Sequence, residues 1–319
     1  MKMNKEKFLA LPKRTFGQKL KRDFTRNWMV YLMFLPVFVY FIVFSYFPMS
    51  GIAIAFQNYE LGDSFFGKPF TFNHFYNYFR DPYFLRTLRN TLIYGVCGIC
   101  FTFPSSVLLA LSLNAVKWKP FKRFIQTVSY MPYFISLVVV CGMISAFLDP
   151  YGFIGSFFQK MGWTEEGVSV LGDPRYFRSV IIITDIWQTI GFGSILYVAS
   201  LSAIDPTLYE AADIDGAGRW KKLRHITIPS ILPTLMMMLV LKVGTILSVG
   251  YEKIVLLYSG ETWGVGETIT SYAYRLGFVS SLPQYSYTTA IGLVNSVMTL
   301  VLLVVANYAS RKLTKQGLL

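Results

Sequence analysis

Two groups of side chains, most of them polar, stand at helical spacing inside apolar runs of this chain. Asp185, Gln188 and Phe192 fall at positions i, i+3 and i+7, which places them on one face of a helix. The second group would share one face of another continuous helix and comprises Lys242, Thr245, Val249 and Glu252. Asn295 stands in a later apolar run. Placing polar groups in such apolar surroundings costs free energy. These residues therefore predict contact with a polar solute that passes through the protein.

We expect the two faces to line a central water-filled cavity in which Asp185 and Lys242 pair. Lys242 can also meet a carboxylate of an acidic solute. Under the alternative interpretation, Asp185 and Lys242 form a buried structural pair, and the polar stripe only holds helices together. Glu252 and Lys253 are expected near the outer membrane face, as part of a gate or of an interface.

The loop 204–230 is the most polar internal stretch next to these apolar runs. Asp205 followed by Pro206 predicts the start of a short helix, because the carboxylate caps free backbone N–H groups. Gly216 predicts a sharp bend, after which a basic helical segment follows. Pro229 and Pro233 are expected in the first turn of the next apolar helix. The small side chains of the loop predict close approach of a partner, and the alternative is an ordinary solvated loop.

This loop resembles the EAA signature of the membrane subunits of binding-protein-dependent ABC importers. The matching positions are Glu210, Ala211, Ala212, Asp215, Gly216, Ala217, Ile226, Pro229 and Pro233. Leu223 departs from the aromatic residue usual in the family. The resemblance implies that residues 209–218, Tyr209 to Gly218, form a coupling helix that docks on an ATPase subunit. It also implies that Glu210 and Asp215 make charged contacts and that Gly216 is the bend.

Two further stretches narrow the resemblance to carbohydrate permeases of the maltose-transporter type. Residues 131–139 read MPYFISLVV, and residues 248–260, SVGYEKIVLLYSG, resemble the polysaccharide or complex-oligosaccharide branch. The resemblance implies uptake of a carbohydrate, an oligosaccharide, and the charge of Lys242 suggests an acidic one. It implies four kinds of partner: a second homologous permease subunit in a heterodimer, two ATP-binding subunits that hold ATP and Mg, an extracellular substrate-binding protein, and the oligosaccharide itself.

The elements that must position these residues are membrane-spanning helices. Hydrophobic residues make up 54% of the 319 residues and charged residues only 15%, well below a soluble domain. Six apolar runs long enough to cross a bilayer are predicted at 28–48, 88–116, 124–148, 179–203, 231–257 and 287–310. We therefore expect an all-α membrane protein with the type I ABC importer permease fold.

The basic residues predict the orientation of these helices. Of the 30 Lys and Arg residues, 20 lie in the tails and in the loops on one side. By the positive-inside rule, both termini and the loop 204–230 are cytoplasmic, in a bacterial inner membrane. The predicted organisation is a basic N-terminal tail (1–27), a six-helix permease domain (28–310) and a C-terminal tail (311–319).

Several other functions lack the residues that they need. The sequence contains no P-loop, no metal-ligand cluster and only two distant histidines, so we expect no bound cofactor and no enzymatic activity. The net charge of +13 is read as a membrane signal rather than as one for nucleic acid. The alternatives left open are a permease for a non-sugar solute such as a polyol phosphate, an ion-coupled carrier and a membrane-bound glycosyltransferase.

Overall fold

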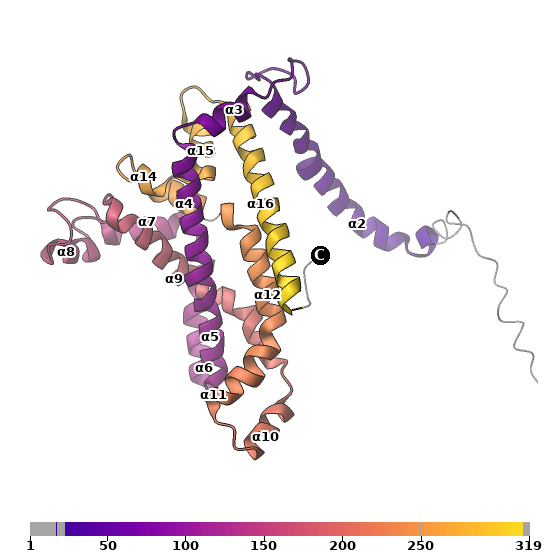
Figure 1. Cartoon of the computed structure of the whole chain (residues 1–319), viewed down its shortest axis with the longest axis vertical. Coiled ribbons are helices and arrows are strands. Elements are labelled where there is room, and N and C mark those ends of the chain that lie inside the picture. Colours follow the sequence, from indigo (N-terminus) through magenta and orange to yellow (C-terminus); the bar gives the residue numbers. More distant parts are fainter. Residues whose placement is uncertain (1–16, 18–22, 249, 315–319) are drawn as a thin grey trace, which may run out of the picture.

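In the computed structural model, which describes residues 17, 23–248 and 250–314, every regular element is a helix (Figure 1). Six of these helices are long and apolar enough to cross a membrane, so the predicted number of spans is confirmed. They are Trp28–Phe56, Phe84–Ala115, Leu137–Lys160, Pro174–Ser202, Arg219–Gly244 and Tyr285–Lys312. Each contains an apolar stretch of about 18 residues or more, which is close to what hydrocarbon of bilayer thickness demands.

The first span stands apart from the other five. It consists of α2 (Trp28–Phe41), a π turn (Ile42–Tyr46) and a 3₁₀ helix (Phe47–Phe56), and only the last of these reaches the bundle, against α16 (Tyr285–Thr314). Every residue of α2 is exposed, although the helix is apolar on all sides (Figure 1). A helix that is apolar all round belongs in lipid or against another protein.

The second and fourth spans pack together along most of their length. The second runs from α4 (Phe84–Cys97) through a π turn (Gly98–Thr102) into α5 (Phe103–Ala115). The fourth is the 29-residue helix α9 (Pro174–Ser202), and it contacts α5 more extensively than any other element does. Both sets of bounds lie within five residues of the predicted ones.

The third predicted span is not one helix. The run 124–148 begins inside α6 (Lys119–Tyr130), passes through a 3₁₀ turn (Met131–Phe134) and an extended pair, Ile135 and Ser136, and ends in α7 (Leu137–Leu148). Pro132 lacks the N–H that a continuous helix would use, which explains why the chain departs from α geometry here. The helix α8 (Phe153–Lys160) follows α7 after a short turn.

The fifth predicted span is broken as well. A continuous helical segment from Arg219 combines α11 (Arg219–Lys222), a π turn (Leu223–Thr227) and α12 (Ile228–Gly244). Pro229 lies in the first turn of α12, as predicted, whereas Pro233 lies inside that helix. The chain then makes a 3₁₀ turn (Ile246–Ser248) and restarts as α13 (Tyr251–Leu257). Gly95 permits this break, because a Cβ there would lie 2.8 Å from the carbonyl oxygen of Ile246.

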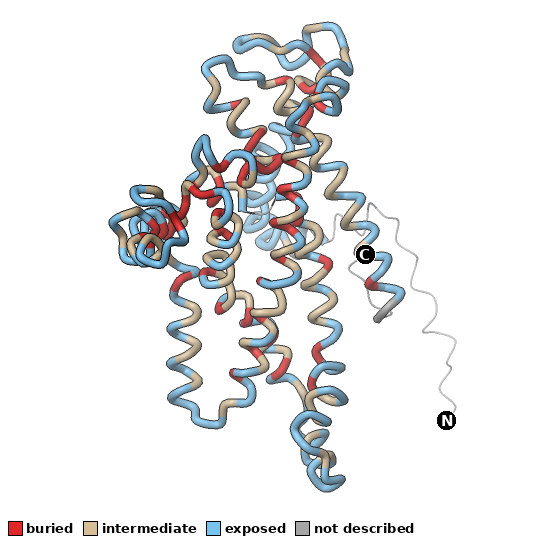
Figure 2. Tube along the Cα trace, turned by 60° about the vertical axis from the view of Figure 1, so that its left-hand side comes forward, coloured by how far each residue is buried: buried red, intermediate tan, exposed pale blue. Residues whose placement is uncertain are grey.

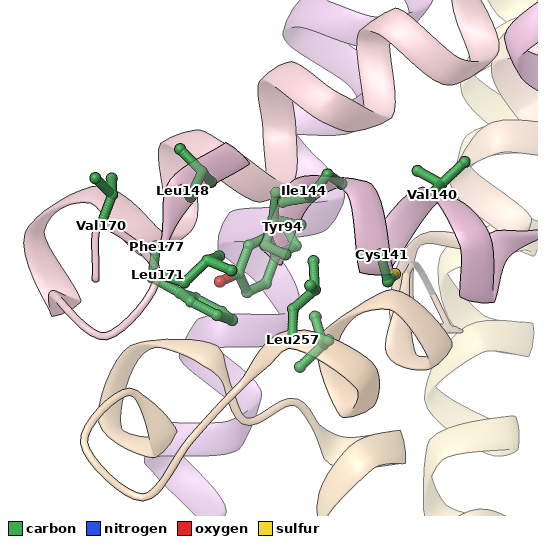
Figure 3. Close-up of a cluster of buried hydrophobic side chains, with 11 residues drawn as sticks. Tyr94, Val140, Cys141, Ile144, Leu148, Val170, Leu171, Phe177 and Leu257 are labelled. Atoms are coloured by element: carbon green, nitrogen blue, oxygen red, sulfur yellow. The ribbon is translucent and has the colours of Figure 1, made fainter. Parts of the chain in front are cut away.

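Buried residues gather where the broken helices meet α4 and α9 (Figure 2). One cluster of apolar side chains joins α4, α7, α9 and α13, and Figure 3 shows Tyr94, Ile144 and Leu257 converging in it. Opposite ends of the molecule carry its two sets of loops. The helix α10 (Pro206–Ile214) lies at one end, and α3 (Asn73–Arg80), α14 (Trp263–Gly266) and α15 (Ile269–Tyr274) lie toward the other (Figure 1).

Candidate functional site

The loop 204–230 folds locally as its sequence predicts. Asp205 caps α10, because its Oδ1 accepts a hydrogen bond from the N–H of Thr207 at 2.9 Å. At the other end of α10, Gly216 has a φ of +70°, in the left-handed region. The N–H of Ala217 donates to the carbonyl of Ala212 at 2.8 Å, and that of Gly216 to the carbonyl of Asp213 at 3.1 Å. These two bonds form a Schellman motif, which fixes the bend between α10 and α11.

Two side-chain contacts connect α10 to the helical segment after the bend. Tyr209 Oη lies 2.9 Å from Thr227 Oγ1, and Lys222 forms an ion pair with Asp213. The same loop leaves large apolar side chains in the open: Ile214 is 88% exposed and Trp220 is 82% exposed. A braced loop with exposed apolar side chains is suited to dock against another protein.

At the depth of the helix breaks, a cavity of about 310 Å³ opens beside α9. It is lined by residues from α7, α9, α13 and the preceding turn: Leu137, Asp185, Gln188, Ser248, Gly250, Tyr251, Glu252 and Lys253. Three of the predicted path residues, Asp185, Gln188 and Glu252, therefore meet in one cavity. Irregular backbone within a membrane-spanning bundle is tolerated where it lines a cavity or is covered by protein.

The predicted pairing of Asp185 with Lys242 is wrong. The nearest ammonium to Asp185 belongs to Lys253, whose Nζ lies 4.0 Å from Asp185 Oδ1, and Thr102 donates a hydrogen bond to Asp185 Oδ2 at 3.2 Å. Lys242 and Thr245 line a different cavity, of about 320 Å³, that also includes Thr102. Their expected single face with Glu252 does not exist, because the helix ends at Gly244 and restarts at Tyr251.

Lys253 is the residue of this site that the sequence analysis missed as a path residue. Only 5% of its side chain is exposed, and within the described part of the chain its ammonium has no hydrogen-bond partner. A space of about 20 Å³ between it, Asp185, Thr102 and Gly98 has room for one water molecule. A continuous helix would have placed Lys253 one position past the predicted face, and the break at Gly250 turns it inward instead.

The remaining predicted path residues lie elsewhere. Phe192 stacks on Tyr133 with ring centroids 3.9 Å apart and an interplanar angle of 2°, next to the break in the third predicted span. Asn295 is outside both cavities, and its Oδ1 is buried without a hydrogen-bond partner among the residues described. Val249 lies outside the described residues.

A buried charge cluster fastens the loops at the end opposite α10. The Glu267 side chain is fully buried and accepts hydrogen bonds from Arg86 at 2.6 Å and from Arg275 at 2.7 Å. Asn90 of α4 donates to the carbonyls of Gly264 and Glu267, and Arg178 of α9 donates to Asn90 Oδ1 at 2.7 Å. These residues are far apart in the sequence, so no local pattern could have joined them.

Comparison with known proteins gives consistent matches. Residues 102–315 match the family described as binding-protein-dependent transport system inner membrane component. The chain is 38% identical over 301 residues to protein LplB of Bacillus subtilis (strain 168), covering 94% of this chain and 92% of LplB. It is 37% identical over 295 residues to the polygalacturonan/rhamnogalacturonan transport system permease protein YteP of the same organism, covering 91% and 89%.

Among solved structures, the chain resembles a subunit of a bacterial alginate ABC transporter crystallised in complex with an alginate pentasaccharide-bound periplasmic protein. The TM-score is 0.84 and the sequence identity 38%, over 94% of this chain and 100% of that one. A second crystal structure, of a bacterial ABC transporter involved in the import of the acidic polysaccharide alginate, gives a TM-score of 0.83 at the same identity, over 93% and 99%.

Proposed function

The chain belongs to the family of binding-protein-dependent transport system inner membrane components, a family of transport permeases, and on this premise we propose that it is the permease subunit of an ATP-driven importer for oligosaccharides. The observation that carries the proposal is 38% identity along almost the whole length of an alginate transporter subunit. YteP, whose name gives polygalacturonan and rhamnogalacturonan as cargo, supports the same class of substrate.

The loop 204–230 is proposed as the coupling element, with Tyr209, Glu210, Ala211, Ala212, Asp215, Gly216, Ala217 and Gly218 at its docking surface. Its exposed Ile214 and Trp220 favour a protein partner, because water would otherwise surround large apolar surfaces. That partner is an ATP-binding subunit, two of which hold ATP and Mg. The sidedness follows from the basic residues, which place this loop and both termini in the cytoplasm.

The second permease subunit is proposed from the first span. Each residue of α2 is exposed and the helix is strongly apolar. We therefore expect lipid and another chain to cover its surface. The extracellular binding protein is proposed from the alginate transporter structure, in which a periplasmic protein carries the pentasaccharide. In this assembly, closure of the ATPases would shift the population between two states of the cavities.

The two cavities are proposed as the path of the sugar, with Asp185, Gln188 and Glu252 in one and Lys242 and Thr245 in the other. No carboxylate lies within 4.0 Å of the Lys242 ammonium among the described residues, which leaves this positive charge for an anionic group of the cargo. Phe192 and Asn295 remain candidates only for positions outside these two cavities.

Uptake into membrane vesicles tests the proposal. Vesicles that contain the complete complex should accumulate oligosaccharide only with ATP and the loaded binding protein, and collapse of the proton and sodium gradients should leave uptake unchanged. Uptake that depends on those gradients would favour an ion-coupled carrier instead. Accumulation of a polyol phosphate in place of the sugar would favour the alternative solute.

Replacement of Lys242 tests the acidic cargo. Lys242→Ala should lower uptake of an acidic oligosaccharide about tenfold or more, the value of one hydrogen-bonded charge, and should affect a neutral one much less. Lys242→Arg keeps the charge and should retain most of the preference. Equal losses for both oligosaccharides in Lys242→Ala would contradict the role of the charge.

A further inference from the structure

A large open cavity lies at the end of the molecule opposite the loop 204–230. Its volume is about 660 Å³, within the range of binding pockets. Three segments meet around it: the chain just after the first span, α3 with the turn that follows, and the loops around α15 and the start of α16 (Figure 1). We call this cavity the outer pocket. The cavities of the proposed sugar path involve none of its lining residues.

Asp81 sits in a rigid frame at the wall of the outer pocket. Its Oδ2 accepts hydrogen bonds from Tyr272 Oη and Tyr287 Oη, both at 2.6 Å, and its Oδ1 accepts one from the N–H of Tyr83 at 2.8 Å. Burial alone would raise the pKa of Asp81, but the hydroxyl donors, the backbone donor and the nearby charge of Arg86 outweigh it and hold the pKa below its usual range. The carboxylate is therefore ionised at neutral pH.

The rest of the outer pocket offers acceptors and negative charge. Glu60 is 86% exposed at its side chain, and its single ion pair within the described residues is a long one, 3.7 Å from Lys68. His74 Nε2 lies 3.1 Å from the carbonyl of Gln57, so a neutral ring that donates there leaves Nδ1 as an acceptor. The lining contains two carboxylates and five tyrosines, and no lysine or arginine.

We propose that the outer pocket is a docking site for a basic side chain, an arginine or a lysine, of the extracellular substrate-binding protein. This inference rests on the proposed function. A guanidinium or ammonium group supplies only donors and positive charge, which matches the acceptors and the two carboxylates of the pocket. Tyrosine faces also attract cations, and arginine and tyrosine dominate the binding energy of protein interfaces. An acidic sugar, by contrast, would be repelled by Glu60 and Asp81.

Introduction of a positive charge at exposed positions tests the proposal without disturbing the frame around Asp81. Glu60→Lys and Asn77→Lys place a cation in the outer pocket, whereas Glu166→Lys makes a comparable change on an exposed residue outside it. The dissociation constant of the sugar-loaded binding protein is measured on the complete complex in nanodiscs. The two pocket variants should weaken binding roughly three- to tenfold and flatten its dependence on salt, and Glu166→Lys should leave both unchanged.

Small probes give an independent reading of the same pocket. Argininamide should compete with the binding protein for the wild-type complex, and the uncharged citrulline amide should not. Unchanged affinity in both pocket variants would overturn the inference, as would equal weakening by Glu166→Lys. Loss of free oligosaccharide binding with unchanged protein affinity would make the pocket a sugar site instead. If no sugar-loaded binding protein stimulates the ATPase activity of the wild-type complex, the proposed function is overturned, and this inference with it.

Discussion

The ammonium of Lys253 lies 4.0 Å from the carboxylate of Asp185, and these two charges join the restarted helix α13 to α9. Because only 5% of the Lys253 side chain is exposed, removal of the Asp185 charge leaves a buried ammonium without a counter-charge. Asp185→Asn should therefore destabilise the protein by about 3–5 kcal/mol, measured by thermal unfolding in detergent.

The double variant Lys253→Met with Asp185→Asn is the matched control for this pair. It removes both charges, so it should unfold at a higher temperature than Asp185→Asn alone. If the loss of stability in the double variant instead equals the sum of the losses in the two single variants, the two residues do not act as a pair.

Gly216 offers a test of the bend between α10 and α11. Its φ of +70° costs a β-branched residue about 1–2 kcal/mol or more, although no atom stands in the way of a side chain. Gly216→Val should reduce ATPase stimulation and uptake while the protein stays in the membrane, and Gly216→Asn should be milder, since asparagine tolerates this region.

Gly260→Val is the control for Gly216→Val, because Gly260 lies outside the loop 204–230, does not have a left-handed φ and has equally open surroundings. Glu210→Lys, on the exposed face of α10, should also uncouple ATP hydrolysis from transport. Normal stimulated ATPase and normal uptake in both Gly216→Val and Glu210→Lys would remove the coupling role from this loop.

Glu267 should be the most sensitive residue of the outer loops. Glu267→Gln keeps the shape of the side chain but leaves Arg86 and Arg275 without their shared carboxylate, at a cost of about 3–5 kcal/mol. Glu261→Gln, on an exposed residue of the same loop, should change stability by less than about 0.5 kcal/mol. Unfolding temperatures of the two variants that do not differ would contradict the structural importance of the buried cluster.

The hydrogen bonds to Asp81 predict a pH dependence with a definite sign. The folded carboxyl has a lowered pKa, whereas the unfolded one titrates near about 3.9. Its contribution to stability is therefore complete above that unfolded value and is lost as the pH falls through the folded pKa. Between about pH 5 and about pH 2.5, the unfolding temperature should fall more steeply in the wild type than in Asp81→Asn.

Tyr272→Phe checks the origin of that effect, because it removes one of the two hydroxyl donors to Asp81. The folded pKa of Asp81 in this variant should lie closer to the unfolded value, so the acid loss of stability should be smaller than in the wild type and should be complete at a higher pH. Identical acid profiles for the wild type, Asp81→Asn and Tyr272→Phe would show that the hydroxyl groups do not set the pKa of this carboxyl.

The parts of the structure that could be predicted are those set by neighbouring residues. The cap at Asp205 and the bend at Gly216 depend on contacts within six positions of the chain, so the sequence of the loop is sufficient for both. The number of spans follows from apolar length, which the bilayer imposes on each helix separately, but the bounds of the third and fifth spans do not.

The parts that could not be predicted depend on packing between distant segments. The break after Gly244 is accommodated by Gly95 of another helix, and nothing within the run 231–257 records that contact. Without that break, the sequence does not place Lys253 in the cavity. It therefore pairs Asp185 with Lys242, although the carboxylate of Asp185 faces Lys253. The partners of Glu267 were hidden for the same reason, since Arg86 is 181 residues away.

The unbroken helical segment from Arg219 to Gly244 joins the bend to the cavity that holds Lys242. Its 26 residues span about 39 Å, and its midpoint falls between Pro229 and Pro233. If this segment tilts as one body about its midpoint, its two ends move by equal distances in opposite directions. A displacement of Gly218 toward the centre of the bundle would then move Lys242 away from that centre. The cavity end and the loop end of the segment would thus move in opposite directions.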